Sequence, residues 1–150
     1  MIDTSNNTIT TTNALVYKKV NDELFYLLAQ ENDSYWGLPG GAKEVEDNNL
    51  LTAIKRELKE ELSLEESDYQ VVETDIQKEF EYNHRQSSRF GKRGIVKFFI
   101  VEVHDLEKIK SSSEIQQVEW FTEKEASEKF TFGYVREGFF ETAKLINKII

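Results

Sequence analysis

Residues 56–61 (RELKEE) place an arginine and three glutamates on one short segment. If the segment is helical, Glu57 and Glu61 lie one turn apart with Glu60 beside them, because residues three and four apart share a helix face. Like charges at that spacing repel unless a cation lies between them. Magnesium takes oxygen ligands and also binds phosphate oxygens. The spacing therefore predicts a magnesium site for a phosphate compound; a solvated helix whose glutamates pair with Lys and Arg is the alternative.

The segment before this helix is rich in glycine and favours the functional interpretation. Residues 36–41 (WGLPGG) hold the only proline of the chain and three of its seven glycines. Glycine adopts positive φ at little cost and lets the backbone approach a ligand closely. A glycine loop followed by three clustered carboxylates is unusual for an ordinary surface.

Residues 41–64 resemble the signature of the Nudix hydrolases, which reads Gly-x5-Glu-x7-Arg-Glu-apolar-x-Glu-Glu-x-Gly-apolar. Residues 56–64 (RELKEELSL) match its second half except at Ser63, where the signature has glycine. The resemblance extends over nearly the whole chain. It implies an α+β fold, an α/β/α sandwich with a mixed central sheet, and a hydrolase that acts on phosphorus-containing acid anhydrides.

The chain departs from the signature in the first half as well. Asp47 stands at the glutamate position, and the segment before Arg56 is one residue longer than the pattern. We expect the extra residue in the turn after Asp47, where Asn48 or Asn49 would cap the helix. Serine at position 63 would adopt left-handed backbone at a cost of about 1 kcal/mol. Neither departure removes Glu57, Glu60 or Glu61.

The resemblance also implies a role for each residue of the site. The expected metal ligands are oxygens of Gly41 (through its backbone carbonyl), Glu57, Glu60, Glu61 and Glu114. Glu60 or Glu61 is expected to be the base that accepts the proton of water, and Arg56 to orient the carboxylates through charge-assisted hydrogen bonds. Glu114, six residues before Trp120, matches a glutamate that is a ligand or base in some family members; an exposed loop acid is the alternative. The expected cofactor is Mg2+, with Mn2+ as a substitute.

Residues 83–101 contain no acidic side chain, although acidic residues outnumber basic ones 28 to 19 in the chain. The cations of this window are Arg85, Arg89, Lys92, Arg93 and Lys97. A loop between two strands could bring them over the metal site to bind phosphates, and Lys97 and Arg93 are the main candidates. A solvated hairpin tip is the alternative. Three aromatic residues could stack on a nucleobase or belong to the core or its rim: Tyr82, Phe90 and Tyr134.

Periodicity predicts the elements that position these residues. Strands are expected over residues 9–18, 23–30, 69–82, 94–104 and 117–121. The signature helix would turn Leu50, Ile54 and Leu58 to the core. Two further helices are expected over residues 122–129 and 132–147, the first with a capping box of Thr122 and Glu125.

Composition indicates one domain over residues 1–150, with residues 1–8 flexible. The start does not resemble a signal peptide, and no apolar run is long enough to span a membrane. The chain has no cysteine, which excludes disulfides and thiolate chemistry and suits the cytoplasm. A net charge of −9 argues against general binding to nucleic acids. The oligomeric state stays open.

Residues 96–99, 120–126 and 130–137 are similar to the corresponding segments of diadenosine tetraphosphate hydrolases. The resemblance therefore implies a small nucleotide substrate, with a dinucleoside polyphosphate as the first choice. A MutT-like nucleoside triphosphate pyrophosphatase is the alternative among enzymes, and nucleotide sugars and capped RNA ends stay open. A nucleotide-binding sensor with weak or no turnover is the alternative from another class.

Overall fold

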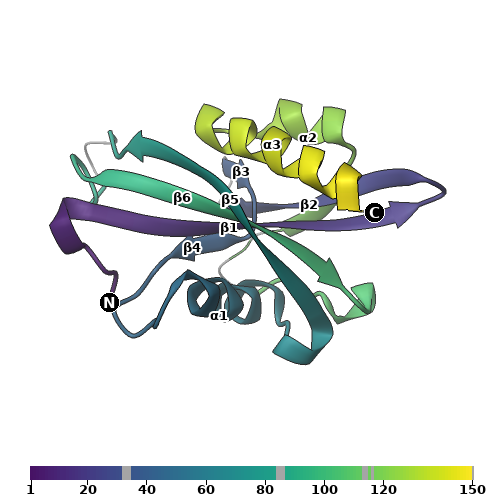
Figure 1. The fold of residues 1–150 in the computed structure, drawn as a ribbon, viewed down its shortest axis with the longest axis horizontal. Helices are drawn as coiled ribbons and strands as arrows, with labels where there is room; N and C mark the ends of the chain where they lie inside the picture. Colours follow the sequence, from purple (N-terminus) through teal and green to yellow (C-terminus); the bar gives the residue numbers. More distant parts are fainter. Residues whose placement is uncertain (32–34, 84–86, 113–114, 116, 150) are drawn as a thin grey trace.

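The computed structural model of the chain describes residues 1–31, 35–83, 87–112, 115 and 117–149. Its centre is a sheet with the strand order β3-β2-β1-β6-β5, to which β4 adds on β1 and β7 on β2. Helix α1 (Leu50–Leu62) covers one face of the sheet, and α2 (Glu123–Lys129) and α3 (Gly133–Ile149) cover the other (Figure 1). This confirms the predicted α/β/α sandwich.

The sheet is mixed, as expected. Strands β1 (Thr8–Val20) and β6 (Arg93–Val103) run parallel, and their register pairs Thr12 with Lys97. The other pairings are antiparallel: β1 with β2 (Glu23–Glu31) and β4, β2 with β3 and β7 (Gln117–Phe121), and β6 with β5 (Tyr69–Glu81). The five strands predicted from alternating patterns are all present.

Two short strands lie where the sequence indicated a glycine loop. They are β3 (Tyr35–Gly37) and β4 (Gly40–Ala42). Strand β4 pairs with residues 11–13 of β1. Three residues that include two glycines carry no alternating pattern, so this pairing through the backbone had no signal in the sequence.

Helix α1 begins and ends as its sequence predicts. The side chain of Asn49 accepts a hydrogen bond from the backbone N–H of Thr52 at 2.9 Å, so the second of the two candidate asparagines is the cap. At the other end, Ser63 has left-handed backbone with φ 62°. The N–H of Leu64 then donates to the carbonyl of Leu58 at 3.2 Å, which closes the last turn.

The core has two parts, one on each face of the sheet. Phe98 and Phe99 are neighbours in β6 and point to opposite faces, as alternation requires. Phe99 packs in the part under α1 with Leu58, and Phe98 packs in the part under α3 with Phe139. Each side chain of a strand therefore belongs to either the α1 face or the α3 face, which decides the functional surface it can reach.

The first eight residues, which we expected to be flexible, contact the segment that follows β4. The carbonyl of Met1 accepts from the N–H of Val45 at 2.8 Å, and Asp3 forms an ion pair with Lys43 at 3.0 Å. The residues after β4 present backbone groups that no other strand pairs within the described chain, so the N-terminal segment satisfies them. Among the described residues, no helix has both the length and the apolar character required to cross a membrane.

Candidate active site

Two of the three signature glutamates are buried between α1 and β4. Glu57 and Glu61 are 9% and 4% exposed, whereas the side chain of Glu60 is 44% exposed. The carboxylate of Glu61 accepts a hydrogen bond from the backbone N–H of Gly40 at 2.7 Å. The helix thus turns two carboxylates inward and leaves the third at the surface.

The two glycines of β4 allow this close approach. A Cβ on Gly41 would lie 2.5 Å from Oε1 of Glu57, within the space that the carboxylate occupies. Gly40 has φ +149°, and a Cβ there would lie 1.9 Å from the carbonyl oxygen of Thr12. Both positions therefore require glycine, one for the carboxylate and one for the pairing with β1.

Arg56 connects the carboxylates of the site to Asp47. Its Nη2 donates to Oδ2 of Asp47 at 2.9 Å and to the carbonyl of Ala42 at 3.1 Å. Its Nη1 donates to Glu57 at 2.9 Å and to Glu60 at 3.2 Å. One guanidinium thus fixes the signature helix to β4 and to the turn after it, and its hydrogen bonds to Asp47 raise the pKa of Arg56.

Asp47 is itself buried, at 6% exposed. Burial acts to raise the pKa of its carboxyl, but the hydrogen bonds from Arg56 and from the N–H of Glu44, together with the charge of Arg56, hold that pKa below its usual value. Asp47 therefore stays ionised and orients Arg56, even though the signature has the longer glutamate at this position.

The backbone carbonyl on the Glu61 side belongs to Gly40, whereas we expected that of Gly41. The carbonyl of Gly41 accepts from Oγ1 of Thr12 at 3.1 Å and therefore faces β1. In a strand, N–H and C=O of one residue face the same side, and those of the next residue face the other side. Because the N–H of Gly40 donates to Glu61 and faces away from β1, the carbonyl of Gly40 shares that edge.

The donors at this place fit magnesium. They are oxygens of carboxylates and backbone, which hard cations prefer, and the missing Cβ of Gly41 leaves room beside Glu57. In the part of the chain that the structure describes, no three acidic or histidine side chains are gathered into a complete metal site. Arg56 pairs with Glu57 and Glu60, and the fourth predicted ligand, Glu114, lies outside the described residues.

A cleft of about 650 Å³ starts at the same two glycines and extends along the α3 side of the sheet. Tyr82 and Tyr134, both predicted to contact substrate, line it. Tyr134 stacks on Phe80 with ring centroids 4.1 Å apart, and burial, with a smaller contribution from Tyr82, raises the pKa of Tyr134 to about 12. Arg89 lies over the ring of Tyr82 at 5.6 Å. The cleft therefore has aromatic walls and a cation at its rim.

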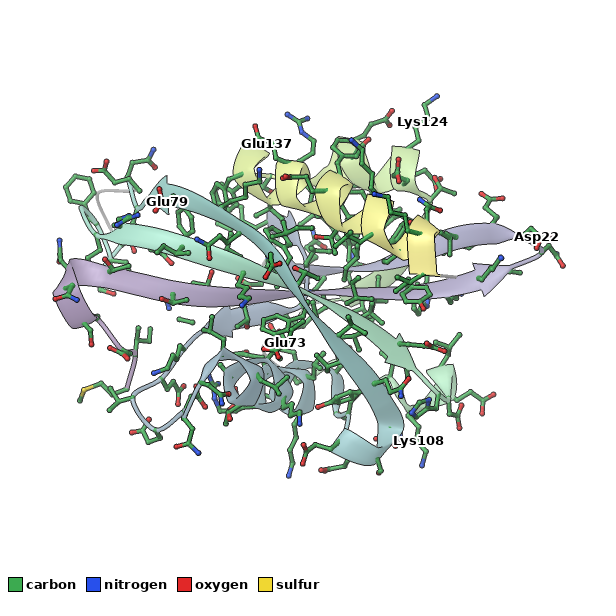
Figure 2. All side chains as sticks on the ribbon, viewed as in Figure 1. Asp22, Glu73, Glu79, Lys108, Lys124 and Glu137 are labelled. Atoms are coloured by element: carbon green, nitrogen blue, oxygen red, sulfur yellow. The ribbon has the colours of Figure 1, made fainter. Side chains whose placement is uncertain are left out.

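The other two predicted substrate residues lie on the opposite face of the sheet. Lys97 alternates with Val96 and Phe98, which face α3, so Lys97 faces the side that carries Glu57. Arg93 is two alternations further from the glycines and forms an ion pair with Glu79, which Figure 2 shows near the end of β5. Neither residue lines the cleft.

Two further predicted residues are placed away from the cleft or are outside the described chain. Phe90 is 49% exposed and does not line the cleft. Arg85 lies outside the described residues.

Sequence reasoning missed three aromatic side chains of the cleft: Tyr35, Phe80 and Phe132. Phe80 had a usable signal, because it stands two residues before Tyr82 in a predicted strand and must share its face. Tyr35 and Phe132 contact each other with centroids 5.7 Å apart, although they are nearly one hundred positions apart in the chain. No local pattern reports such a contact.

The comparisons with known proteins agree with this geometry. The model of the NUDIX domain matches residues 10–142. No curated protein matches the sequence significantly. The structure is similar to an Ap4A hydrolase of C. elegans in a binary complex, with a TM-score of 0.78 and 17% identity over 94% of this chain and 99% of the other.

Two other solved structures are similar over most of their length. The dihydroneopterin triphosphate pyrophosphohydrolase of E. coli has a TM-score of 0.73 and 18% identity, over 86% of this chain and 90% of the other. The NUDIX domain of NrtR from Shewanella oneidensis, in complex with ADP ribose, has a TM-score of 0.67 and 15% identity, over 92% and 88%. At such identities these likenesses show the fold, whereas the family model spans most of the chain, so the chain belongs to the Nudix family of hydrolases that act on phosphoanhydride bonds.

Proposed function

We propose that this Nudix hydrolase is magnesium-dependent and acts on a dinucleoside polyphosphate such as diadenosine tetraphosphate, which it cleaves to a nucleoside triphosphate and a monophosphate. The observation that carries the proposal is the shared position of Gly40 and Gly41. They line the aromatic cleft, and they also contact the buried carboxylates of Glu57 and Glu61. A nucleoside held in the cleft would therefore extend its phosphates toward these carboxylates.

The residues of the chain supply the remaining functions of the reaction. Bound magnesium would neutralise phosphate charge and orient water for in-line attack. Glu57 and Glu61, with the carbonyl of Gly40 in place of Gly41, would hold it. Glu60 and Glu61 are the candidates for the base, and Glu60 is the one whose side chain is open to water. Glu114 stays a candidate ligand or base from its place in the sequence.

The tetraphosphate is favoured by two independent likenesses. Residues 96–99, 120–126 and 130–137 are similar to diadenosine tetraphosphate hydrolases, and the fold is similar to the C. elegans enzyme over nearly the whole length of both chains. The runner-up is a nucleoside triphosphate pyrophosphatase, because a cleft of about 650 Å³ suits a single nucleoside. A sensor without turnover is the third candidate, since the similar NUDIX domain of NrtR was solved with ADP ribose.

Product analysis separates the three. The purified chain would be incubated with Mg2+ and a panel of diadenosine tetraphosphate, ordinary and oxidised nucleoside triphosphates, ADP-ribose and a nucleotide sugar. Release of ATP and AMP from the tetraphosphate, faster than any other reaction, is the expected result. Monophosphate and pyrophosphate from a triphosphate would replace the proposal by the runner-up, and binding without product from any compound would replace it by the sensor. Glu57→Gln is the negative control for turnover.

A further inference from the structure

Strand β4 holds the site together with very few side chains of its own. It consists of Gly40, Gly41 and Ala42, yet its backbone lies against Glu57 on one side and donates to Glu61. Glycine is the residue with the greatest backbone freedom. The orientation of this backbone must therefore be fixed by groups from other elements.

Thr12 of β1 supplies such a group. It is completely buried, with 0% of its surface exposed. Its Oγ1 donates to the carbonyl of Gly41 at 3.1 Å and lies 3.4 Å from the N–H of Gly41, from which it accepts. One hydroxyl thus contacts both polar groups of the residue in the middle of β4, and both contacts are on the edge that faces β1.

Glu61 contacts the opposite edge of the same short backbone. Its carboxylate accepts from the N–H of Gly40. The peptide between Gly40 and Gly41 is consequently held from two sides, by Thr12 and by a carboxylate of the signature helix. If the hydroxyl were removed, the peptide could rotate, and the direction of the Gly40 carbonyl and the position of Glu61 would both become less defined.

We propose that Thr12 is a positioning residue for the metal site: its hydroxyl fixes the orientation of the Gly40–Gly41 peptide, and through it the carbonyl of Gly40 and the carboxylate of Glu61. The inference rests on the proposed metal dependence of this site but on no particular substrate. Partners that orient metal ligands without touching the metal are typically worth about 10- to 100-fold in metal affinity.

The test is the affinity for Mn2+ alone, measured by electron paramagnetic resonance or calorimetry without any nucleotide. Thr12→Val keeps the shape of the side chain and removes the hydroxyl, and it should weaken Mn2+ binding about 10- to 100-fold. Thr12→Ser keeps the hydroxyl and should bind Mn2+ within about threefold of the native chain, as expected for a retained orienting partner. Should the valine variant fail to fold, Thr12→Ala against Thr12→Ser isolates the hydroxyl in the same way.

Thr142 offers a matched control. It is also 0% exposed, and its hydroxyl donates to a backbone carbonyl, that of Gly138 in α3, at 2.7 Å. Thr142→Val should lower the free energy of unfolding as Thr12→Val does but leave Mn2+ binding unchanged.

Native Mn2+ affinity in Thr12→Val, or an equal loss in Thr12→Ser or Thr142→Val, would overturn the inference. A native chain that binds Mn2+ but hydrolyses none of the nucleotides would contradict the proposed function and leave this test intact.

Discussion

Glu57 depends on the absence of a single methyl group. Its carboxylate lies where a side chain on Gly41 would begin, with Oε1 2.5 Å and Oε2 3.0 Å from that position. The obstacle would be the end of a flexible side chain and not backbone, so an alanine there would displace the carboxylate before it disturbed the fold. Glycine at position 41 is therefore a requirement of the site more than of the strand.

Gly41→Ala tests this requirement. Glu57 should swing out of the site, so Mn2+ affinity should fall by more than about tenfold while the chain stays folded. Gly37→Ala is the control, since a Cβ on Gly37 meets nothing within 4 Å and its φ lies outside the left-handed region. Titration of both variants with Mn2+, with circular dichroism as the check on folding, decides the matter. Native affinity in Gly41→Ala would contradict the role given to Glu57.

Lys97 and Arg93 should differ in their effect on a polyphosphate substrate. Lys97 lies beside Thr12 on the face that carries Glu57, whereas Arg93 is further away and pairs with Glu79. Lys97→Ala should raise the KM for the polyphosphate about tenfold, the usual worth of a hydrogen bond to a charged group, and Arg93→Ala should raise it less.

Steady-state kinetics of the two variants measure this difference. Lys108→Ala is the control, because Figure 2 shows Lys108 at the end of the molecule opposite Glu79. An unchanged KM in Lys97→Ala, or a larger effect of Arg93→Ala, would show that the phosphates do not lie along this face.

Asp47 makes the stability of the fold depend on pH. Its pKa is lower in the folded chain than the ordinary value of 3.8, so the unfolded chain binds more protons as the pH falls through this range. The stabilisation is complete above the ordinary value and is lost as the pH drops toward the lowered pKa. Asp47→Asn should therefore be less stable than the native chain at about pH 6, and the difference should shrink at about pH 3.

Urea unfolding at several pH values measures the difference for Asp47. Glu128→Gln, which changes an exposed acid on α2, is the control. A difference between the native chain and Asp47→Asn that stays constant with pH would show that the ion pair with Arg56 does not hold this carboxyl ionised.

At the scale of the element, α1 is fixed at both ends by residues that leave its glutamates alone. The N–H groups of Lys110 and Ser112 donate to the carbonyls of Leu62 and Glu61, both at 3.0 Å. The last turn of the helix is thus tied to the segment before β7. Ser63 lies between these contacts, and its left-handed backbone directs the chain back toward the sheet.

Ser63→Gly should stabilise the chain, because glycine adopts φ 62° without the steric cost that serine bears. The expected gain in the free energy of unfolding is about 0.5–1 kcal/mol after the added freedom of glycine in the unfolded chain. Ser63→Ala is the control, since it loses the hydrogen bond from Oγ to the carbonyl of Lys110 but keeps the strain, and it should not stabilise. Chemical unfolding of the three chains gives the answer, and a less stable glycine variant would refute it.

The molecule as a whole brings a metal site and a nucleoside cleft together at one strand end. The carboxylates approach β4 from the α1 face, and the cleft lies on the α3 face, so substrate would cross the end of the sheet at Gly40 and Gly41. Neither helix layer alone forms the complete site. This arrangement also concentrates buried negative charge in a chain whose net charge is already −9.

Magnesium should therefore stabilise the whole chain. A metal that binds only the folded state adds about 2.7 kcal/mol at one hundred times its Kd, which corresponds to a rise in Tm on the order of 5–10 °C for a chain of this size. EDTA should remove the rise, and Glu57→Gln should abolish it. Differential scanning calorimetry with and without Mg2+ is the measurement, and an equal rise in Glu57→Gln would place the metal elsewhere.

The sequence predicted the elements with strong local patterns. Five strands, the three main helices, the Asn49 cap and the left-handed Ser63 all follow from alternation, from spacing of three and four, and from the chemistry of helix ends. It also predicted that Glu57 and Glu61 share a helix face, because spacing along a helix is a local property.

What the sequence by itself determined, then, is the identity of the family, the sandwich of helices around a mixed sheet, and the carboxylates of the site. Tertiary structure alone decided that β4 pairs with β1, that Gly40 and not Gly41 turns its carbonyl to Glu61, and that Thr12 holds the peptide between them. It also decided that Lys97 and Tyr82 serve opposite faces of the sheet. These facts depend on which strand neighbours which and in what register, and pairing between segments distant in the chain leaves no periodic trace in either one.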